Sequence, residues 1–291
     1  MRRLTLLIFI CILLPFSQSY ASRAITLPAE ESFNTDAWTS DLVFPDTTDC
    51  GGTTTHTTTN CWSGGCAKLT PPTSLCAGGG INGGGAGIGW LTYSNTGTVN
   101  IRMVLRFNQL WAQHYTGSDT NKFIVLDTTS PCPVSNDCRV TILSFNCSGS
   151  GGARYCSFGI LDAGESYIYR TAPNRGWIED ALFRVSSTEH YDEHFVIELA
   201  VDVVNHIADL YIWTQDGTYN GLQIENIGIA PSVSYSDNWY MSYYNGMGTA
   251  ADYFLVDNLS VSSSYIGPPT GFVGGSVPTV TGITLTGGVR Q

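Results

Sequence analysis

Alternation of apolar and polar side chains is the feature of this sequence that most restricts its fold. In the segment 99–108, apolar side chains occupy every second position from Ile101 to Phe107. The segment 194–202 repeats this pattern from Phe195 to Val201. A period of two places such side chains on one face of a β-strand, whereas a helix needs apolar spacings of three and four. The chain is therefore expected to fold from strands.

Further segments have the composition of strands, and turn residues separate them. Asp216-Gly217 and Asn245-Gly246 are typical of tight turns. Many short strands joined by turns predict an all-β protein, built as a two-sheet antiparallel sandwich of the jelly-roll type and stapled by disulfides. The additional expected strands are 122–127, 139–145, 155–161, 167–170, 210–214, 239–244 and 253–262.

Charge is scarce in this chain and mostly negative. Charged residues make up 13% of the sequence, about half of the ~25% that is usual in soluble domains. This composition excludes a solvated disordered chain and a coiled coil. With 13 Lys and Arg against 24 Asp and Glu, the chain is also not a basic nucleic-acid binder.

The first 21 residues have the organisation of a secretory signal. Arg2 and Arg3 precede an apolar run over residues 4–16, and small residues suited to signal peptidase follow. The run is shorter than the ~20 residues that span a bilayer, so we expect no membrane span and a secreted, extracellular or periplasmic protein. Removal of residues 1–21 leaves 11 basic and 24 acidic residues, a net charge of −13.

Eight cysteines follow residue 21, and all of them lie between residues 50 and 156. In an exported chain, this number indicates disulfides rather than a metal site, and no CxxC pair of the kind that holds zinc occurs. Short separations favour pairing of Cys132 with Cys138 and of Cys147 with Cys156. The remaining four are expected to pair among themselves: Cys50, Cys61, Cys66 and Cys76.

Composition divides the mature chain into one domain and a tail. Residues 22–266 have the length of one sandwich domain, with a cysteine- and glycine-rich insertion at 49–89. Residues 267–291 are rich in Gly, Pro and Thr, as is typical of a tail or linker. Alternation at 278–286 leaves two alternatives open, a flexible end or a strand that joins a neighbouring molecule and causes self-association.

Two parts of the insertion lack a strand pattern. The segment 53–59, around His56, is expected to form an exposed loop bordered by disulfides. The segment 78–89 resembles a nucleotide-binding loop only superficially, because no helical pattern and no Gly-Lys-Ser/Thr follow it. We therefore expect a flexible loop there.

Several segments occur in an order that is found in one superfamily. They are Glu31-Ser32-Phe33 with Trp38, then 66–72, 122–126, 196–198 with 211–213, and 254–261 followed by 265–268. This order resembles that of the concanavalin A-like lectin/glucanase superfamily, particularly its bacterial laminarinase-like and polysaccharide-lyase-like jelly rolls. The resemblance covers most of residues 31–268. Because the superfamily contains enzymes, lectins and structural modules, the resemblance implies a fold more than an activity.

The resemblance also implies that a sugar chain lies on the outward, concave face of one sheet. Arginine forks bind carboxylates, and aromatic rings stack on sugars, so such a face would suit a uronic-acid polysaccharide. If 99–108 and 194–202 both belong to that sheet, the side chains on this face are Arg102, Arg106, His194 and Glu198, with Tyr211 and Trp213. In the alternative interpretation, the two arginines form structural ion pairs with Glu198 and Asp202.

Catalytic motifs of the resembling families are incomplete here. Lyase-like members place Glu between two arginines of one strand, but this chain has Val104 between Arg102 and Arg106, and the Gln-Ile/Val-His motif does not occur. His194 and Tyr244 would be the base and the acid of a lyase. Paired glycosidase carboxylates need a regular spacing on one strand. The acidic segment 189–193 lacks that spacing.

Calcium is a further implication of the resemblance, because jelly rolls of this kind often tie their first and last strands with this ion. Glu31 and Asp257 stand at the corresponding positions and would supply oxygen ligands. In the alternative interpretation, both are unliganded surface carboxylates.

Together, these observations favour a secreted, lectin-like protein that binds a polysaccharide or glycoconjugate. A divergent polysaccharide lyase that cleaves uronate-containing glycans by β-elimination is the second hypothesis. The third is a structural or adhesive extracellular protein that acts through its C-terminal tail.

Overall fold

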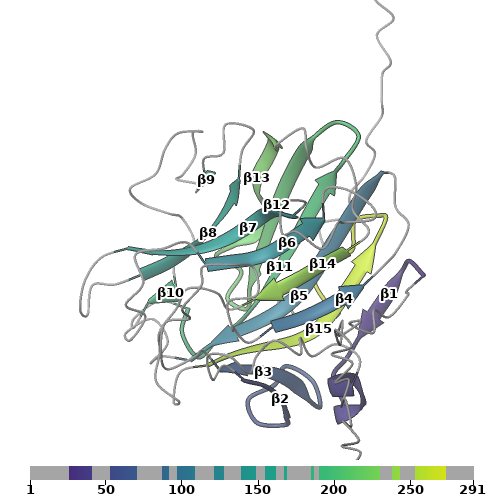
Figure 1. The fold of residues 1–291 in the computed structure, drawn as a ribbon. Helices are drawn as coiled ribbons and strands as arrows, with labels where there is room; N and C mark the ends of the chain where they lie inside the picture. The colour runs from purple at the N-terminus through teal and green to yellow at the C-terminus, as the bar shows by residue number, and fades with distance from the viewer. Residues whose placement is uncertain are drawn as a thin grey trace, which may run out of the picture.

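Two antiparallel β-sheets make up the protein in the computed structural model (Figure 1). The structure describes residues 26–40, 53–70, 87–91, 97–108, 121–127, 139–148, 155–161, 167–168, 185–186, 190–229, 238–242 and 253–272. Apart from a short 3-10 helix, η1 (Asp36–Ser40), the regular elements in these ranges are strands. The predicted all-β antiparallel fold is confirmed. No helix in the described ranges is long and apolar enough to cross a membrane.

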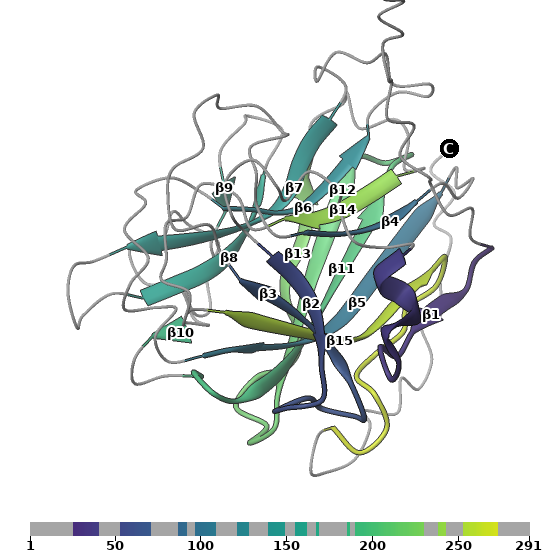
Figure 2. The same cartoon turned by 60° about the horizontal axis from the view of Figure 1, so that its bottom comes forward.

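Among the described residues, eight strands form the sheet that carries the candidate site, seven along one path of pairing and the eighth beside that path. In the order of their pairing, they are β13 (Asn220–Gly228), β12 (Ile207–Thr214), β11 (His194–Asp202), β5 (Thr98–Phe107), β15 (Phe254–Ser262), β3 (Cys66–Thr70) and β2 (Thr53–Thr57). The first half of β15 pairs with β3, and its second half pairs with β1 (Ala29–Glu31). Figure 1 shows β2 and β3 below the long strands β5 and β11, and Figure 2 turns this end of the molecule toward the viewer.

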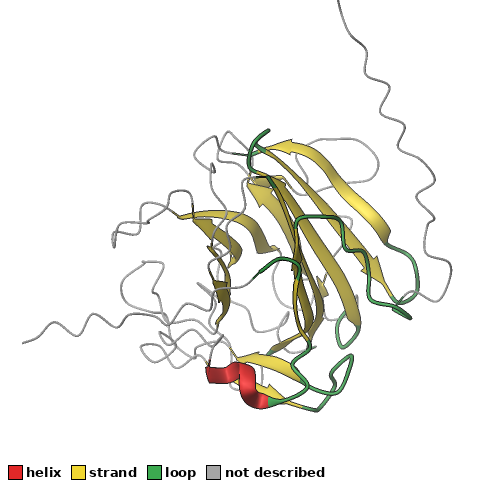
Figure 3. Ribbon diagram, turned by 90° about the vertical axis from the view of Figure 1, so that its right-hand side faces the viewer, coloured by secondary structure: helices red, strands yellow, loops and turns green. Residues whose placement is uncertain are grey.

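Seven strands form the second sheet. Their order is β10 (Val185–Ser186), β8 (Tyr155–Leu161), β7 (Arg139–Ser148), β6 (Asn121–Asp127), β14 (Asn238–Ser242) and β4 (Gly87–Leu91), with β9 (Tyr167–Ile168) beside β8. Figure 3 views the molecule from its side and shows the strands as two layers, with η1 at one end.

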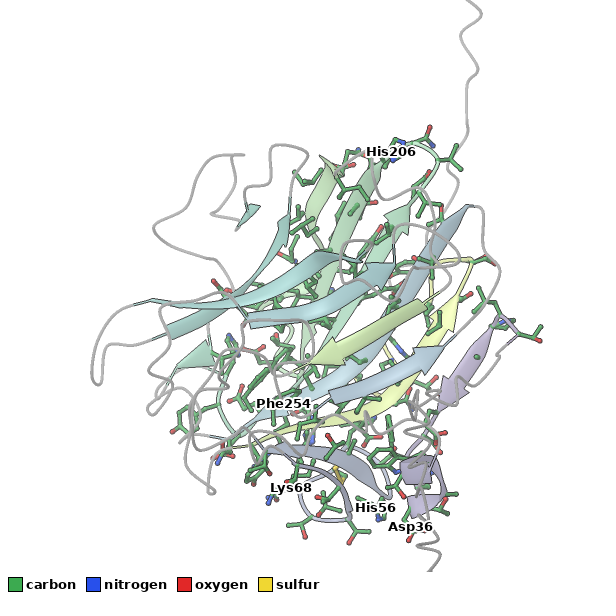
Figure 4. The ribbon with its side chains drawn as sticks, in the orientation of Figure 1. Asp36, His56, Lys68, His206 and Phe254 are labelled. Carbon is green, nitrogen blue, oxygen red and sulfur yellow. A yellow bond between two sulfur atoms is a disulfide. The ribbon has the colours of Figure 1, made fainter. Side chains whose placement is uncertain are left out.

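Apolar side chains from both sheets form one core between the layers. The inward residues of β5 and β11, predicted from their alternation, all belong to it. Phe195 connects the layers, because its ring lies 5.8 Å from Phe107 in its own sheet and 6.1 Å from Phe158 in the other. Phe254 stacks on Phe107 at 5.1 Å and points into the interior in Figure 4. Burial of these large rings stabilises the contact between the sheets.

The structure differs from the sequence prediction within the segment 49–89. Residues 53–57, predicted to lie in a loop, form the edge strand β2, and residues 87–91 at the end of the glycine run form β4. Threonine is common in strands, but neither segment has the apolar alternation on which the prediction relied. The strand β13 was also not predicted. Register shifts opposite Leu210 place extra residues in this strand, and these residues break the alternation of apolar and polar side chains.

A disulfide between Cys61 and Cys66 closes the turn between β2 and β3. This pair lies within the predicted group of four cysteines. The turn needs glycine, since a Cβ atom on Gly64 would lie 1.9 Å from the side-chain oxygen of Asn34, and the φ of Gly64 is +52°. The hairpin loop is therefore held from both sides, by a covalent bond and by a close backbone contact. Cys50, Cys76, Cys132 and Cys138 lie outside the described residues, as does the predicted signal 1–21.

The register of β7 and β8 allows a test of the predicted pair Cys147 and Cys156. These residues lie directly opposite each other in the two antiparallel strands, where Cα atoms are about 4.5–5.5 Å apart, within the range of a disulfide. We expect peptide mapping of the unreduced protein to recover one cross-linked pair of peptides that contains both residues. Recovery of either cysteine as a free thiol, or linked elsewhere, would contradict this assignment.

Candidate functional site

The outer face of the eight-stranded sheet, which points away from the seven-stranded sheet, carries the predicted site residues. Arg102 of β5, Glu198 of β11 and Tyr211 of β12 are directly opposite one another and form one row across three strands. The next row, two residues along each strand, consists of Val104, Val196 and Trp213. Two residues further along, Arg106 of β5 and His194 of β11 are opposite each other. Directly opposite residues place their side chains on the same face. The expectation that these residues share one face is therefore met.

A segment that follows β15 covers much of this face. We call residues 263–272 the strap. The carboxylate of Glu198 accepts hydrogen bonds from the backbone N–H groups of Ile266 at 2.9 Å and Gly267 at 2.8 Å. Gly267 has a φ of +75°, a conformation that glycine adopts without strain. At the end of the strap, Phe272 is buried against Val104 and its neighbours. The first residues of the predicted tail 267–291 are therefore tied to the sheet at Gly267 and Phe272.

Glu198 and Arg102 are buried beneath the strap rather than presented to solvent. Glu198 is 0% exposed and Arg102 is 5% exposed. Burial raises the pKa of Glu198, and the two backbone hydrogen bonds and Arg102 partly offset this effect. The guanidinium of Arg102 donates to the side chains of Asn258 and Ser260 and lies 3.6 Å from Glu30. Both charged groups thus have partners within the chain.

Arg106 and His194 also bind groups of this chain. Arg106 donates to the backbone oxygen of Asp192 at 3.1 Å and pairs with its carboxylate at 2.9 Å. His194 Nε2 lies 2.9 Å from the backbone oxygen of Asn60, and burial lowers the pKa of its imidazole. Asp202, the alternative arginine partner, instead accepts hydrogen bonds from the turn residues Val204 and Asn205. Tyr244, the candidate lyase acid, lies outside the described residues.

Three aromatic side chains, two from β12 and one from the strap, pack together on this outer face. We call Tyr211, Trp213 and Tyr265 the aromatic patch. The rings of Tyr211 and Trp213 are stacked at 5.9 Å, and the ring of Tyr265 lies 5.2 Å from that of Tyr211. Trp213 is fully buried, Tyr211 is half-buried, and Tyr265 is 49% exposed. The patch therefore has a rigid buried base and a solvent-exposed upper ring.

Tyr211 is held in its neutral form across the physiological pH range. Burial raises its pKa to about 12, with smaller contributions from neighbouring carboxylates. Its hydroxyl can thus donate as well as accept a hydrogen bond. On β13, Leu222 lies directly opposite Tyr211 and is 37% exposed. The exposed apolar surface of the patch consequently extends onto the edge strand.

Sequence reasoning missed Tyr265, Phe272 and Trp62 as parts of this face. Trp62 belongs to the disulfide-closed hairpin and packs on Phe272 at 4.8 Å. Tyr265 and Phe272 follow the last predicted strand, in a segment rich in Gly and Pro. Their only signal was a large aromatic residue at each end of an otherwise small-residue stretch.

The two predicted calcium ligands lie on opposite faces of the eight-stranded sheet. Glu31 is opposite Leu259, a core residue, whereas Asp257 is opposite Val104 on the outer face. Each carboxylate already accepts hydrogen bonds: Glu31 from Phe33, and Asp257 from Ser63 at 2.8 Å. Because hydrogen-bond donors surround Asp257, this pair does not fit one shared calcium ion. The described residues contain no group of three His, Cys, Asp or Glu side chains that could hold a metal ion.

Comparisons with known proteins give no family for this chain. No family model matches the sequence, and no curated protein does. Among solved structures, an engineered GH43 glycoside hydrolase with endo-xylanase and exo-arabinofuranosidase activity is similar at a TM-score of 0.46 and 11% identity, over 83% of this chain and 42% of that chain. A carbohydrate esterase from the Shiga toxin-encoding bacteriophage phi24B gives 0.38 and 12%, over 80% and 88% of the two chains.

The receptor-binding domain of botulinum neurotoxin type G is a third such structure. It gives a TM-score of 0.33 and 11% identity, over 70% of this chain and 40% of that chain. This chain thus spans about two fifths of the length of the hydrolase and of the neurotoxin domain.

Asp257 predicts a specific pH dependence of stability. Burial raises its pKa to about 6, so the folded state binds this proton more tightly than the unfolded chain. The contribution of Asp257 to stability is therefore greatest below about pH 4 and is lost as the pH rises through 6. In Asp257→Asn this dependence is absent. Relative to the wild type, the variant should gain about 2 kcal/mol between pH 4 and pH 7.

Urea unfolding of both proteins at the two pH values measures this gain. Other carboxylates titrate equally in the two proteins, so their contributions cancel in the comparison. A difference in unfolding free energy that stays constant with pH would show that Asp257 does not carry this proton.

Proposed function

We propose that this protein is a secreted, lectin-like carbohydrate-binding protein with a concanavalin A-like sandwich, and that its ligand stacks on the aromatic patch. The observation that carries the proposal is the half-exposed ring of Tyr265 beside the half-buried ring of Tyr211. Elsewhere on this face, the charged side chains of Arg102 and Glu198 are buried. Contiguous exposed apolar patches often mark binding surfaces, and Tyr265 forms such a patch with Tyr211 and Leu222. A flat ring on a rigid base loses little conformational freedom when a sugar ring packs on it.

Polar groups beside the rings would orient the sugar. The neutral hydroxyl of Tyr211 can donate to or accept from a sugar hydroxyl. Asn220 of β13 is exposed and lies opposite Trp213. A binding surface that combines stacking rings with a few polar groups is typical of small-ligand recognition.

The internal partners of the two arginines favour binding over a lyase reaction. A lyase must neutralise the carboxylate of its substrate with positive groups. Arg102 and Arg106 are instead occupied by Asn258, Ser260 and Asp192. The disulfide Cys61–Cys66 supports secretion, since such bonds persist in oxidising compartments. The third hypothesis, self-association through the tail, concerns residues 267–291, of which 273–291 lie outside the described ranges.

Replacement of Tyr265 tests the proposal. Calorimetric titration with a panel of neutral, acidic and amino oligosaccharides should give heat with at least one member for the wild type. Tyr265→Ala removes the exposed ring, so we expect its affinity for that glycan to fall about tenfold or more. Near-ultraviolet circular dichroism would verify that the variant is folded.

Tyr191→Ala is the matched control, because Tyr191 lies in the turn before β11, outside the aromatic patch. It should bind as the wild type does. The proposal fails if no member of the panel binds to the wild type, or if Tyr265→Ala binds as tightly as Tyr191→Ala.

A further inference from the structure

Carboxylates surround the aromatic patch on the outer face. Glu198 is directly opposite Tyr211, and Asp209 lies two residues before Tyr211 on the same face of β12. Asp209 accepts a hydrogen bond from the backbone N–H of Asn226 at 2.6 Å, which fixes the bulge of β13 that carries the exposed Glu225. All three carboxylates act electrostatically on the Tyr211 hydroxyl. The patch therefore lies in a field of negative charge.

Lysine and arginine are absent from the part of the sequence that follows β10 and forms most of this face. Between residues 185 and 289 the chain contains eleven Asp and Glu and not one Lys or Arg. This interval includes β11, β12, β13, β15 and the strap. Arg102 is the cation opposite Glu198, but it is buried and bonded to Asn258 and Ser260. The negative charge of Asp209 and Glu225 thus remains available to a ligand.

Aromatic faces and carboxylates attract the same class of ligand. The electron-rich face of a tyrosine ring attracts ammonium groups, and nearby carboxylates add Coulomb attraction. An anionic ligand is repelled by both groups, because the ring face and the carboxylates all present negative charge. This disfavours the uronate polysaccharide suggested by the two arginines in the sequence.

We propose that the aromatic patch selects amino sugars, with the ammonium group of a glucosamine-type residue held near Tyr211 between Asp209 and Glu225 while the sugar ring stacks on Tyr265. This inference rests on the proposed carbohydrate-binding function and specifies its ligand class. Uronate-containing glycans are excluded by charge, and neutral glycans bind by stacking alone.

Three oligosaccharides that differ in charge test this selection. Hexamers of glucosamine, N-acetylglucosamine and galacturonate are titrated into the full mature protein at mildly acidic pH, where the glucosamine amine is protonated. We expect the order of affinity glucosamine, then N-acetylglucosamine, then galacturonate. High salt should weaken binding of the first and leave the second unchanged, since salt screens only the charged contact.

Glu225→Gln is the diagnostic variant, because Glu225 is exposed and its replacement preserves size. It should weaken binding of the glucosamine hexamer about two- to fivefold and leave the N-acetylglucosamine hexamer unaffected. Asp36→Asn is the matched control: it removes one charge from η1, which contacts β2 at the opposite edge of the sheet (Figure 4). This control should bind all three hexamers as the wild type does.

The outcomes separate this inference from the proposed function. Binding of the N-acetylglucosamine hexamer that is as tight as, or tighter than, binding of the glucosamine hexamer overturns the amino-sugar selection but keeps the lectin-like function. An equal effect of Glu225→Gln and Asp36→Asn also overturns it, since the attraction would then come from overall charge. Failure of all hexamers and of the wider glycan panel to bind overturns both.

Discussion

The buried carboxylate of Glu198 determines how the outer face of the eight-stranded sheet is closed. A lone ionised carboxylate in such a position would be costly, but here it accepts two backbone hydrogen bonds from the strap and faces Arg102. The same bonds hold the strap, which brings Tyr265 beside Tyr211 and Phe272 beside Trp62. Without these hydrogen bonds, Arg102 and Glu198 would be open to solvent, and the aromatic patch would lose the ring of Tyr265.

The disulfide-closed hairpin is the second support of this face. Its loop contributes Trp62 to the strap contact, Asn60 to His194, and Ser63 to Asp257. These three contacts reach the strap, β11 and β15, respectively. The Cys61–Cys66 bond and the close approach of Gly64 to Asn34 therefore stabilise the outer face at a distance from their own position.

The long strands β5 and β11 were predicted correctly, because apolar and polar side chains alternate regularly along both of them. The sequence also placed Arg102 and Glu198 on one face correctly. It could not show that this face is covered, since the covering segment is a Gly- and Pro-containing stretch without strand or helix periodicity. Whether a polar side chain on a strand faces solvent or a loop is decided by tertiary contacts. Tyr265 was missed for the same reason, and β13 was missed because its bulges disrupt alternation.

The way in which the strap is attached has a mechanical consequence. β15 lies inside the sheet and is hydrogen-bonded to strands on both of its edges, whereas Gly267 and Ile266 are bonded to the side chain of Glu198. A pulling force applied to the chain beyond Phe272 would load the Phe272–Trp62 contact first, and then the two bonds to Glu198 one after the other. The strap would therefore detach at a lower force than β15, because its few contacts break one at a time. The backbone hydrogen bonds on both edges of β15 would share the load. Tension on the C-terminal side of the protein would thus be felt at Tyr265 before the sandwich itself yields.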